Sequence, residues 1–476
     1  MLVESFSGIR GIYKEDLSDA VVRNYAVSYA GLLKKNKKNK VIVIGMDTRS
    51  SSPHIKEEMK KVFLEEGFDV IDVGFNTTPA IQLGVREFNA GGGVVISASH
   101  NEPEWNGWKF LSENGSMLPV DEIDNVIRNA KSNPGRMGGR RGKDVDKARE
   151  LREKYISFVL DCIGKKGIGA IRNAKLKVVI DPNGGAATVV IKDILEKAGV
   201  KGIYKNMDLG VFNRLIEPNQ KSLAYLAFYV EDLKADLGGG WDCDGDRVEI
   251  VLPNDSEFVK RNGKMLSGQY ILALLVEEVM SEYKGKYRYV VTNDATSDVV
   301  REIAKRHNAK VVEVEVGEIN VVEKMDELKA PVGGEGSSSG GIFPPSRCRD
   351  GILTLMMILR LIAKKRKKLS TILEQFPQYY NSVTKVECHA ERAVKVRKEL
   401  EKYWKKQPFI KEIRKTGDET GGLKVIRKDD GWMWFRASKT EAGVFRIITD
   451  AKSKEYADKL LAMGEKSFND CRARLR

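Results

Sequence analysis

The sequence has few cysteines, and they are spaced too widely to form a paired motif. No CxxC pair occurs, which argues against a zinc site and against a redox-active disulfide. A reducing compartment is therefore expected. The five cysteines are Cys162, Cys243, Cys348, Cys388 and Cys471.

Long hydrophobic runs are also missing. Even the apolar stretch of residues 353–363 is interrupted by Arg360, whereas a helix that crosses a bilayer needs about 18 apolar residues. The first residues, MLVESFSGIRG, lack the basic start and the apolar core of a signal peptide. We therefore expect a cytoplasmic protein without a membrane partner.

The formal net charge of +14 fits nucleic acid, a membrane surface or small anionic substrates as a partner. The densest basic runs, residues 34–40 and 364–368, fall where predicted helices end, and no aromatic residues interleave with them for stacking on bases. Solvated helix ends explain these runs, so we expect no nucleic acid partner. A non-catalytic polyanion binder remains an alternative that rests on net charge alone.

Apolar strand-like runs alternate with amphipathic helices over the first 377 residues, which predicts an α/β fold. At 476 residues the chain is too long for one hydrophobic core. The runs that end at Asp47, Ser99, Asp181 and Asn293 resemble one another, so we expect repeated α/β domains whose strand ends face a shared crevice. A helix is expected over residues 144–162, and a hairpin with strands and a helix after residue 377.

A short apolar run, residues 94–96, leads directly into the polar sequence SASHN, which carries Ser99 and His100. The end of a buried parallel strand is where α/β proteins bind their ligands. The hydroxyl of Ser99 is therefore a candidate nucleophile, and Lys109 follows ten residues later. An ordinary polar loop is the alternative, because short motifs often match by chance.

Three aspartates alternate in the sequence WDCDGDR, namely Asp242, Asp244 and Asp246. Alternate side chains of an extended chain share one face, and a modest curl would bring the three carboxylates onto one cation. An EF-hand is excluded, because its sixth position would be Arg247 and its twelfth Pro253. Carboxylates together with phosphate oxygens suit Mg²⁺, and a solvated acidic turn is the remaining alternative.

Two later loops contain groups that suit a phosphorylated sugar. The first, GEGS, places the carboxylate of Glu335 beside hydroxyls, although a disordered Gly/Ser linker would have the same composition. The second, RASKTE, joins Arg436 to two hydroxyls in a tight loop, which suits a phosphate. Arg446 is a possible second cation for that phosphate.

These motifs resemble, in the same order, the signature loops of the α-D-phosphohexomutase superfamily, which contains phosphomannomutases, phosphoglucomutases and phosphoglucosamine mutases. Ser-His-Asn followed by Asn-Gly-x-Lys resembles the phosphoserine loop, and the alternating aspartates with Arg247 resemble the magnesium loop. The turn Gly-Ile-Arg-Gly resembles the one that places an arginine, here Arg10, beside the phosphoserine. GEGS and RASKTE resemble the sugar loop and the phosphate loop. The resemblance covers about residues 5 to 450.

The resemblance implies three similar mixed α/β domains plus a C-terminal α+β domain around a central cleft. We place a phosphoserine domain at 1–143, a metal-binding domain at 144–255, a sugar-binding domain at 256–377 and a phosphate-binding domain at 378–476. The chemistry it implies is reversible phosphoryl transfer between the 1- and 6-positions of a hexose phosphate, mannose and/or glucose, through phospho-Ser99 and a sugar bisphosphate.

The resemblance also implies a role for each matching residue. The expected catalytic residues are Ser99, His100, Lys109 and Arg10. Mg²⁺ would be held by Asp242, Asp244, Asp246 and Ser99, and a sugar bisphosphate would act as activator. The expected substrate contacts are Arg247, Gly317, Glu335, Ser337, Arg436, Ser438, Lys439, Thr440 and Arg446. As a general acid and base, Lys109 would need a pKa lowered by the neighbouring Arg10 and His100.

Three positions depart from the family pattern. Lys439 stands where glycine is usual, the histidine of many sugar loops is absent near Gly341, and the segment at Arg214 only loosely resembles the family's Pro-Glu-Pro region. The choice among Ser337, Ser338 and Ser339 as sugar contact therefore stays open.

The residues leave the substrate and the assembly undecided. A phosphoglucosamine mutase or a phosphopentomutase would use the same loops. A magnesium-dependent sugar phosphatase would use the same aspartates but would release inorganic phosphate. We expect a phosphosugar as the substrate and a monomer or homodimer as the assembly.

Overall fold

A computed structural model describes residues 2–5, 7–135, 138–439 and 443–475. The chain forms two compact units. Unit 1 contains residues 1–267 and 339–373, and unit 2 contains residues 268–338 and 374–476. The chain therefore leaves unit 1 after residue 267 and returns to it at residue 339.

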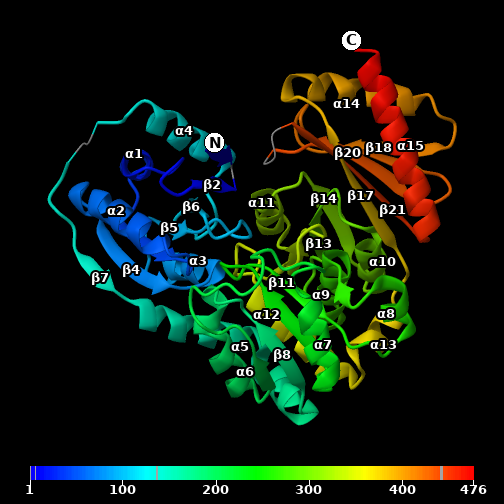
Figure 1. Cartoon of the computed structure of the whole chain (residues 1–476), viewed down its shortest axis with the longest axis horizontal. Helices are drawn as coiled ribbons and strands as arrows, with labels where there is room; N and C mark the ends of the chain where they lie inside the picture. The colour runs from blue at the N-terminus through cyan, green and yellow to red at the C-terminus, as the bar shows by residue number, and fades with distance from the viewer. Residues whose placement is uncertain (1, 6, 136–137, 440–442, 476) are drawn as a thin grey trace. The chain divides into compact units, whose positions relative to one another are not determined.

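The first sheet of unit 1 has seven strands, drawn blue to cyan in Figure 1. Strands β3, β4, β5 and β7 are parallel, whereas β6 runs antiparallel to β5 and β2 runs antiparallel to β6. In sheet order the strands are β1 (Val3–Ser5), β2 (Gly8–Ile12), β6 (Trp105–Leu111), β5 (Gly92–Ile96), β3 (Val41–Met46), β4 (Asp69–Phe75) and β7 (Asp144–Asp146).

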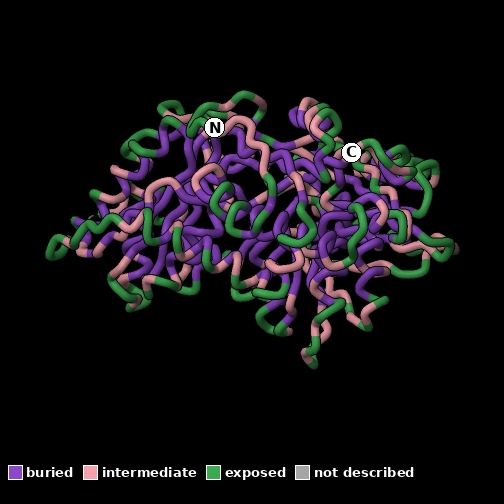
Figure 2. The backbone as a smooth tube through the Cα atoms, turned by 90° about the horizontal axis from the view of Figure 1, so that it is seen from below, coloured by how far each residue is buried: buried purple, intermediate pink, exposed green. Residues whose placement is uncertain are grey.

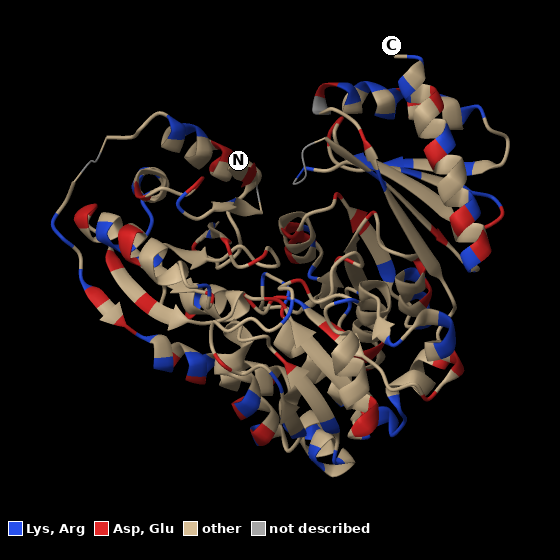
Figure 3. Cartoon of the chain, viewed as in Figure 1, with Lys and Arg blue, Asp and Glu red and all other residues tan. Residues whose placement is uncertain are grey.

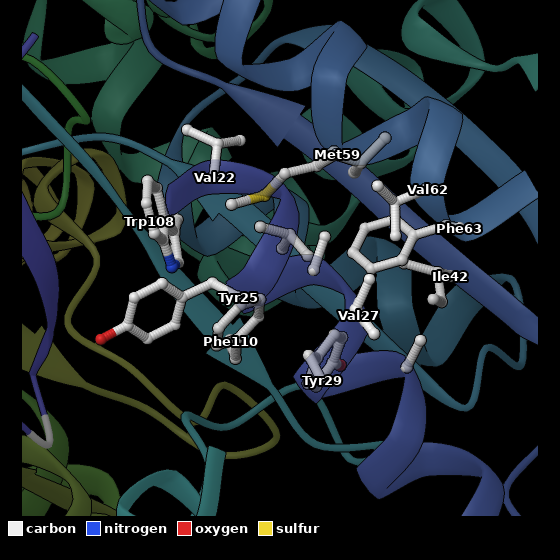
Figure 4. Close-up of a cluster of buried hydrophobic side chains, with 14 of the residues drawn as sticks. Val22, Tyr25, Val27, Tyr29, Ile42, Met59, Val62, Phe63, Trp108 and Phe110 are labelled. Atoms are coloured by element: carbon white, nitrogen blue, oxygen red, sulfur yellow. The ribbon is translucent and has the colours of Figure 1, made fainter. Parts of the chain in front are cut away.

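Helices cover both faces of this sheet, which is why its central strands are continuous apolar runs. Ile42 and Ile44 pack against α1 (Asp19–Lys35), α2 (Ser52–Glu65) and α4 (Val120–Lys131). Figure 4 shows this core, in which the rings of Tyr29 and Phe110 stack with centroids 4.3 Å apart. Val43 faces the other way, toward α3 (Thr78–Glu87) and α5 (Ala148–Ala174).

The second sheet of unit 1 mixes parallel and antiparallel pairs. Its order is β12 (Met265–Leu266), β11 (Val248–Val251), β10 (Leu237–Trp241), β8 (Lys177–Asp181) and β9 (Lys201–Tyr204). The returning helix α12 (Gly351–Lys365) packs on α5 and β11. The other elements of this part are η1 (Ala186–Val189), α6 (Ile191–Ala198), α7 (Ala224–Asp232), α8 (Glu257–Asn262), β16 (Gly341–Ile342) and α13 (Leu369–Glu374).

Unit 2 contains two sheets. Parallel strands β14 (Lys310–Val314), β13 (Tyr289–Asn293) and β15 (Val332–Gly334) belong to the first, with α9 (Gly268–Glu282), α10 (Asp298–Arg306) and α11 (Glu318–Leu328). The second sheet is antiparallel, in the order β17 (Tyr380–Glu387), β21 (Val444–Ala451), β20 (Trp432–Ala437), β19 (Leu423–Arg427) and β18 (Ile410–Lys415). Helices α14 (Ala390–Lys405) and α15 (Lys454–Ala473) cover one of its faces.

A three-strand arrangement occurs three times along the chain. In each case the first strand lies between the second and the third, all parallel: β4-β3-β5, β9-β8-β10 and β14-β13-β15. Ligands of α/β proteins bind where the strand order reverses, which here is beyond the ends of the first and third strands of each repeat. The expected three similar α/β domains and the C-terminal domain with an antiparallel sheet are confirmed.

The helix expected over residues 144–162 is placed differently by the structure. Asp144–Asp146 forms strand β7 beside β4, and helix α5 begins only at Ala148. All three residues of β7 are exposed, so it is backbone pairing with β4, and not the residue pattern, that makes this segment a strand. The domain limits at 143, 255 and 377 stay predictions.

Exposed residues, drawn green in Figure 2, lie on the outside of the trace, and buried residues, drawn purple, fill its interior. The two basic runs lie at the ends of α1 and α12, as expected.

Helices α14 and α15 carry both basic and acidic residues (Figure 3). Among the described residues, none of the helices combines the length and the apolar character that crossing a bilayer requires.

Candidate active site

Ser99 lies in the loop after β5, and its backbone has a left-handed conformation with a φ of 52°. Its amide donates to the Ser97 hydroxyl at 2.8 Å, and its carbonyl accepts a hydrogen bond from Arg49, also at 2.8 Å. Serine rarely adopts this conformation, so the surrounding bonds must hold it there. The loop therefore fixes the direction of the Ser99 side chain, which is buried.

The Ser99 hydroxyl donates to the carboxylate of Asp242, with Oγ and Oδ2 3.0 Å apart. Asp242 begins the loop between β10 and β11, which also carries Asp244 and Asp246. One carboxylate oxygen from each aspartate lies within 4.8 Å of the others, and all three side chains are buried. The structure thus brings the alternating aspartates together and joins them to Ser99.

The aspartate cluster has the properties of a metal site. Oδ1 of Asp244 and Oδ1 of Asp246 have no hydrogen-bond partner among the described residues. Burial, Asp246 and Asp244 raise the pKa of Asp242 well above its usual value, because three buried carboxylates repel one another. A divalent cation would relieve this repulsion and could bind the oxygens that accept no hydrogen bond, and hard oxygen ligands suit Mg²⁺ or Ca²⁺. These residues therefore fit a metal ion.

Lys109 lies on β6, directly opposite Val95 of β5. Its Nζ donates to Oδ2 of Asp244 at 2.8 Å and to Oδ2 of Asp246 at 3.4 Å. Burial lowers the pKa of Lys109, but the two carboxylates outweigh burial and raise it above its usual value. The expectation of a lowered pKa is therefore wrong for this arrangement of charges, because the carboxylates lie within hydrogen-bond distance of the ammonium group.

Arg10 and His100 belong to the same group of charges. Arg10 on β2 donates to Oδ1 of Asn101 at 3.2 Å, and burial together with Arg247 lowers its pKa to about 10. Arg247, burial and Arg10 lower the pKa of His100 to about 2. The imidazole is therefore neutral at physiological pH, and it is suited to hydrogen bonding rather than to carrying positive charge.

The sequence did not point to two residues that contact the cluster. Thr78 donates its hydroxyl to Oδ2 of Asp244 at 2.7 Å and its amide to the Asp244 carbonyl at 2.9 Å. Arg349 donates to Oδ2 of Asp246 at 3.4 Å. Thr78 follows strand β4 at the strand end where ligands bind, so the strand-end rule could have found it. No spacing in the sequence singles out Arg349.

Positive charge gathers around Ser99 in excess of the aspartates. Arg247 lies 3.9 Å from Asp242 and 3.8 Å from Asp246, measured from its Nε to carboxylate oxygens. Arg10, Lys109, Arg247 and Arg349 thus surround three carboxylates. Burial and Arg247 lower the pKa of Arg10, and Arg247 and burial lower that of His100. Buried cations that lie this close suit an additional anion, such as a phosphoryl group on Ser99.

In unit 2 the predicted sugar loop is organised around Glu335. Its Oε1 accepts hydrogen bonds from the Gly317 amide and from Asn293 Nδ2, both at 2.9 Å. Asn293 also lies 3.4 Å from the Ser337 hydroxyl. Gly317 has a φ of 140°, a conformation that favours glycine. The structure thus brings Glu335, Gly317 and Ser337 together at the ends of β13 and β15.

The predicted phosphate loop follows β20, and its cations already have a carboxylate partner. Arg436 Nη2 lies 2.8 Å and Lys439 Nζ lies 2.6 Å from Oε1 of Glu315, which follows β14. Arg446 on β21 is the cross-strand partner of Arg436. Ser438 and Lys439 line a pocket of about 180 Å³. Thr440 lies outside the described residues.

Comparisons with known proteins cover most of the chain. Three family models match: phosphoglucomutase/phosphomannomutase α/β/α domain I at residues 4–136, domain II at 153–255 and domain III at 267–380. A phosphoglucomutase/phosphomannomutase of Thermococcus kodakarensis is 35% identical over 475 residues, with 97% of each chain covered. A probable phosphoglucosamine mutase of Pyrococcus abyssi is 31% identical and covers 98% of this chain and 97% of its own.

The fold is shared with solved structures. A phosphoglucomutase/phosphomannomutase family protein from Burkholderia thailandensis superposes with a TM-score of 0.81 at 20% identity, over 98% of this chain and 97% of that one. At this identity the likeness concerns the fold alone. The 35% identity to the Thermococcus kodakarensis relative over 97% of the chain, together with the three matching family models, shows that the chain belongs to the α-D-phosphohexomutase superfamily. It is an isomerase of the phosphoglucomutase/phosphomannomutase type.

Proposed function

We propose that this phosphohexomutase moves a phosphoryl group between the 1- and 6-positions of mannose or glucose phosphate through a phosphorylated Ser99. The observation that carries the proposal is the hydrogen bond from Ser99 Oγ to Asp242 in the middle of the cationic group. A hydroxyl fixed there can carry a phosphoryl group whose negative charge the surrounding cations balance.

In the proposed reaction, phospho-Ser99 gives its phosphoryl group to a free hydroxyl of the sugar phosphate. The bond between phosphorus and Ser99 Oγ breaks as a bond from phosphorus to the sugar oxygen forms. The sugar hydroxyl gives up its proton to a base and the Ser99 oxygen takes up a proton, so that Ser99 again carries a neutral hydroxyl. The resulting bisphosphate then returns its other phosphoryl group to Ser99. A sugar bisphosphate would also restore an enzyme that has lost its phosphate, which is why we expect it to act as activator.

The residues around Ser99 have separate proposed roles. Asp242, Asp244, Asp246 and the phosphorylated Ser99 would hold Mg²⁺, which when bound neutralises charge on the transferred group. Arg10, Arg247 and Arg349 orient the phosphoryl oxygens through their donors. Lys109 is our candidate proton donor and acceptor, and its raised pKa favours the donor role first.

The loops of unit 2 are proposed to bind the part of the substrate that does not react. Glu335, Gly317 and Ser337 offer acceptors and donors of the kind that sugar hydroxyls need. Arg436, Ser438, Lys439, Thr440 and Arg446 are proposed to bind the distal phosphate. A cytoplasmic location and a monomer or homodimer stay predictions.

A substrate panel tests this proposal. Mannose, glucose, glucosamine and pentose 1-phosphates are each incubated with the enzyme, Mg²⁺ and a catalytic amount of hexose bisphosphate, and the products are followed by phosphorus NMR. We expect isomerisation of mannose or glucose 1-phosphate without loss of phosphate. Preferential turnover of glucosamine or pentose phosphate would assign a different substrate to the enzyme. Release of inorganic phosphate without isomerisation would favour the alternative function, a sugar phosphatase.

A further inference from the structure

Arg214 is a buried arginine in the segment between β9 and α7, and its side chain is only 4% exposed. Its Nε lies 2.6 Å from Oδ2 of Asp181, the last residue of β8. Its Nη2 donates to the Trp241 carbonyl at 2.7 Å. Because Trp241 ends β10 and directly precedes Asp242, one guanidinium group joins the end of the first strand of this repeat to the beginning of the aspartate loop.

The segment around Arg214 is itself held in place. The Asn183 side chain accepts hydrogen bonds from the amides of Asn213 and Arg214 at 2.9 and 3.2 Å, and its Nδ2 donates to the Arg214 carbonyl at 3.1 Å. The next contact reaches the Ser99 loop, because the amide of Ile216 donates to Oε1 of Glu102 at 3.3 Å. The segment therefore contacts both loops that form the candidate active site.

The first repeat contains the same combination of an arginine, an aspartate and a backbone carbonyl. Arg49 follows β3, pairs with Asp47 at 3.4 Å, and donates to the Ser99 carbonyl at 2.8 Å. In both repeats an aspartate ends or follows the first strand, and an arginine paired with it holds a backbone carbonyl at the loop after the third strand. Two occurrences at equivalent places in a repeated fold indicate that the arrangement serves those loops.

We propose that Arg214 is a positioning residue for the aspartate loop: by holding the Trp241 carbonyl against Asp181, it fixes the direction in which Asp242 presents its carboxylate. The inference rests on the proposed function, since it assumes that the aspartates bind Mg²⁺. Groups that orient metal ligands typically change metal affinity 10- to 100-fold when they are replaced. The segment that departs from the family pattern thus serves the reaction.

A role in overall stability alone is the competing explanation, and the chain offers a matched control. Arg360 on α12 also lies in unit 1 and also donates to backbone carbonyls, those of Cys162 and Ile163 on α5, at 3.3 and 3.2 Å. These two carbonyls of α5 are remote in the sequence from the aspartate loop. Replacing either arginine removes backbone contacts, but only Arg214 should change metal binding.

The experiment compares the full-length wild type with Arg214→Lys, Arg214→Met and Arg360→Lys. Isothermal titration with MgCl₂ measures the affinity for Mg²⁺, and thermal unfolding with and without MgCl₂ measures Tm. We expect an about 10- to 100-fold weaker Mg²⁺ affinity for Arg214→Met, a smaller loss for Arg214→Lys, and an affinity within about twofold of wild type for Arg360→Lys. High MgCl₂ should restore turnover to the Arg214 variants.

Two results would overturn the inference, and they are distinguishable. Folded Arg214 variants with wild-type Mg²⁺ affinity would show that Arg214 supports stability only, and would leave the proposed function intact. A wild type that binds no Mg²⁺ would overturn the metal assignment itself, and the inference with it. Should Arg214→Met not fold, Arg214→Lys decides, because it keeps the charge while a single ammonium group cannot form the branched set of contacts.

Discussion

The loops around Ser99 in unit 1 and the phosphate loop of unit 2 differ in how many charged side chains they hold and in how deeply these are buried. Around Ser99, three buried aspartates and four cationic side chains lie together, and their repulsions shift several pKa values. In unit 2 two cations of the phosphate loop, Arg436 and Lys439, share one carboxylate, that of Glu315, and the Lys439 side chain is partly exposed. The charges of the first group are therefore buried together, whereas the second group is smaller and reaches solvent.

This difference predicts how each region contributes to the reaction. Charges in a buried site interact strongly with a ligand, because little water screens them. In the phosphate loop, Arg436 and Lys439 already interact with Glu315. Binding of a phosphate there gains only the difference in interaction free energy between the phosphate and Glu315. We therefore expect large effects on turnover from changes in unit 1, and moderate effects on substrate binding from changes in unit 2.

The largest effect should follow from Ser99→Ala. Loss of the proposed nucleophile should reduce turnover at least about 10³-fold, since the proposed reaction passes through phospho-Ser99. Ser28→Ala is the control, because Ser28 is a buried serine of the same sheet domain that bonds only the Val126 carbonyl among the described contacts. Intact-protein mass spectrometry after incubation with a hexose bisphosphate should find one phosphate in wild type and none in Ser99→Ala. Wild-type turnover by Ser99→Ala would refute the assignment.

Asp244→Asn should have the next largest effect, a loss of about 10²-fold in turnover, because it removes one charge from the proposed Mg²⁺ site while keeping its shape. Addition of excess EDTA to wild type should also stop the reaction. Asp72→Asn is the matched control, since Asp72 is a buried carboxylate paired with Lys60 in the same unit. An unchanged rate of wild type in EDTA would contradict the metal assignment.

Lys439→Gly should raise KM about three- to tenfold and change kcat less, because the distal phosphate is bound alike in ground and transition states. Glu315→Gln should lower KM, since it frees Arg436 and Lys439 for the phosphate. Both effects should shrink at high salt, which screens the partly exposed lysine. Lys452→Ala, which breaks an exposed ion pair with Asp430, is the control. A higher KM in Glu315→Gln would show that Glu315 orients the cations instead of competing with the substrate.

The smallest effect concerns Asp450, a buried carboxyl of unit 2. Burial and Asp298 raise the pKa of Asp450 to about 7. Because the folded state holds this proton more tightly than the unfolded chain, stability should fall as pH rises from about 4 to about 7. Asp450→Asn should reduce this loss by on the order of 1 kcal/mol in thermal unfolding between pH 5 and pH 8, with little change in turnover. An unaltered pH dependence in Asp450→Asn would exclude Asp450 as its source.

Three residues of the site that were predicted from the sequence, Ser99, Asp242 and Glu335, each follow the third strand of a repeat. An apolar run that ends in polar residues marked Ser99, the alternation of aspartates marked Asp242, and the composition of the GEGS loop marked Glu335. The local order of residues was sufficient there, because the fold brings equivalent strand ends to equivalent places.

The missed parts depend on distances between segments that are remote in the sequence. Asp244, 135 residues away, helps to raise the pKa of Lys109, and the partner of Lys439 is Glu315, which follows a strand of another sheet. Arg349 contacts Asp246, and Arg214 contacts the Trp241 carbonyl just before the aspartate loop. No regular spacing in the sequence indicates either contact. Pairings of this kind follow from tertiary packing, which a single sequence does not display.

The passage of the chain out of unit 1 at residue 267 and back at residue 339 has a consequence for biosynthesis. When the first 267 residues have been synthesised, the chain contains the Ser99 loop and the aspartate loop. It still lacks Arg349 and helix α12, which packs on α5. Synthesis of the missing residues up to 373 takes on the order of ten seconds. During that time the apolar side chains of α5 that pack against α12 are exposed to solvent. We therefore expect the nascent chain to bind chaperones until α12 has been synthesised.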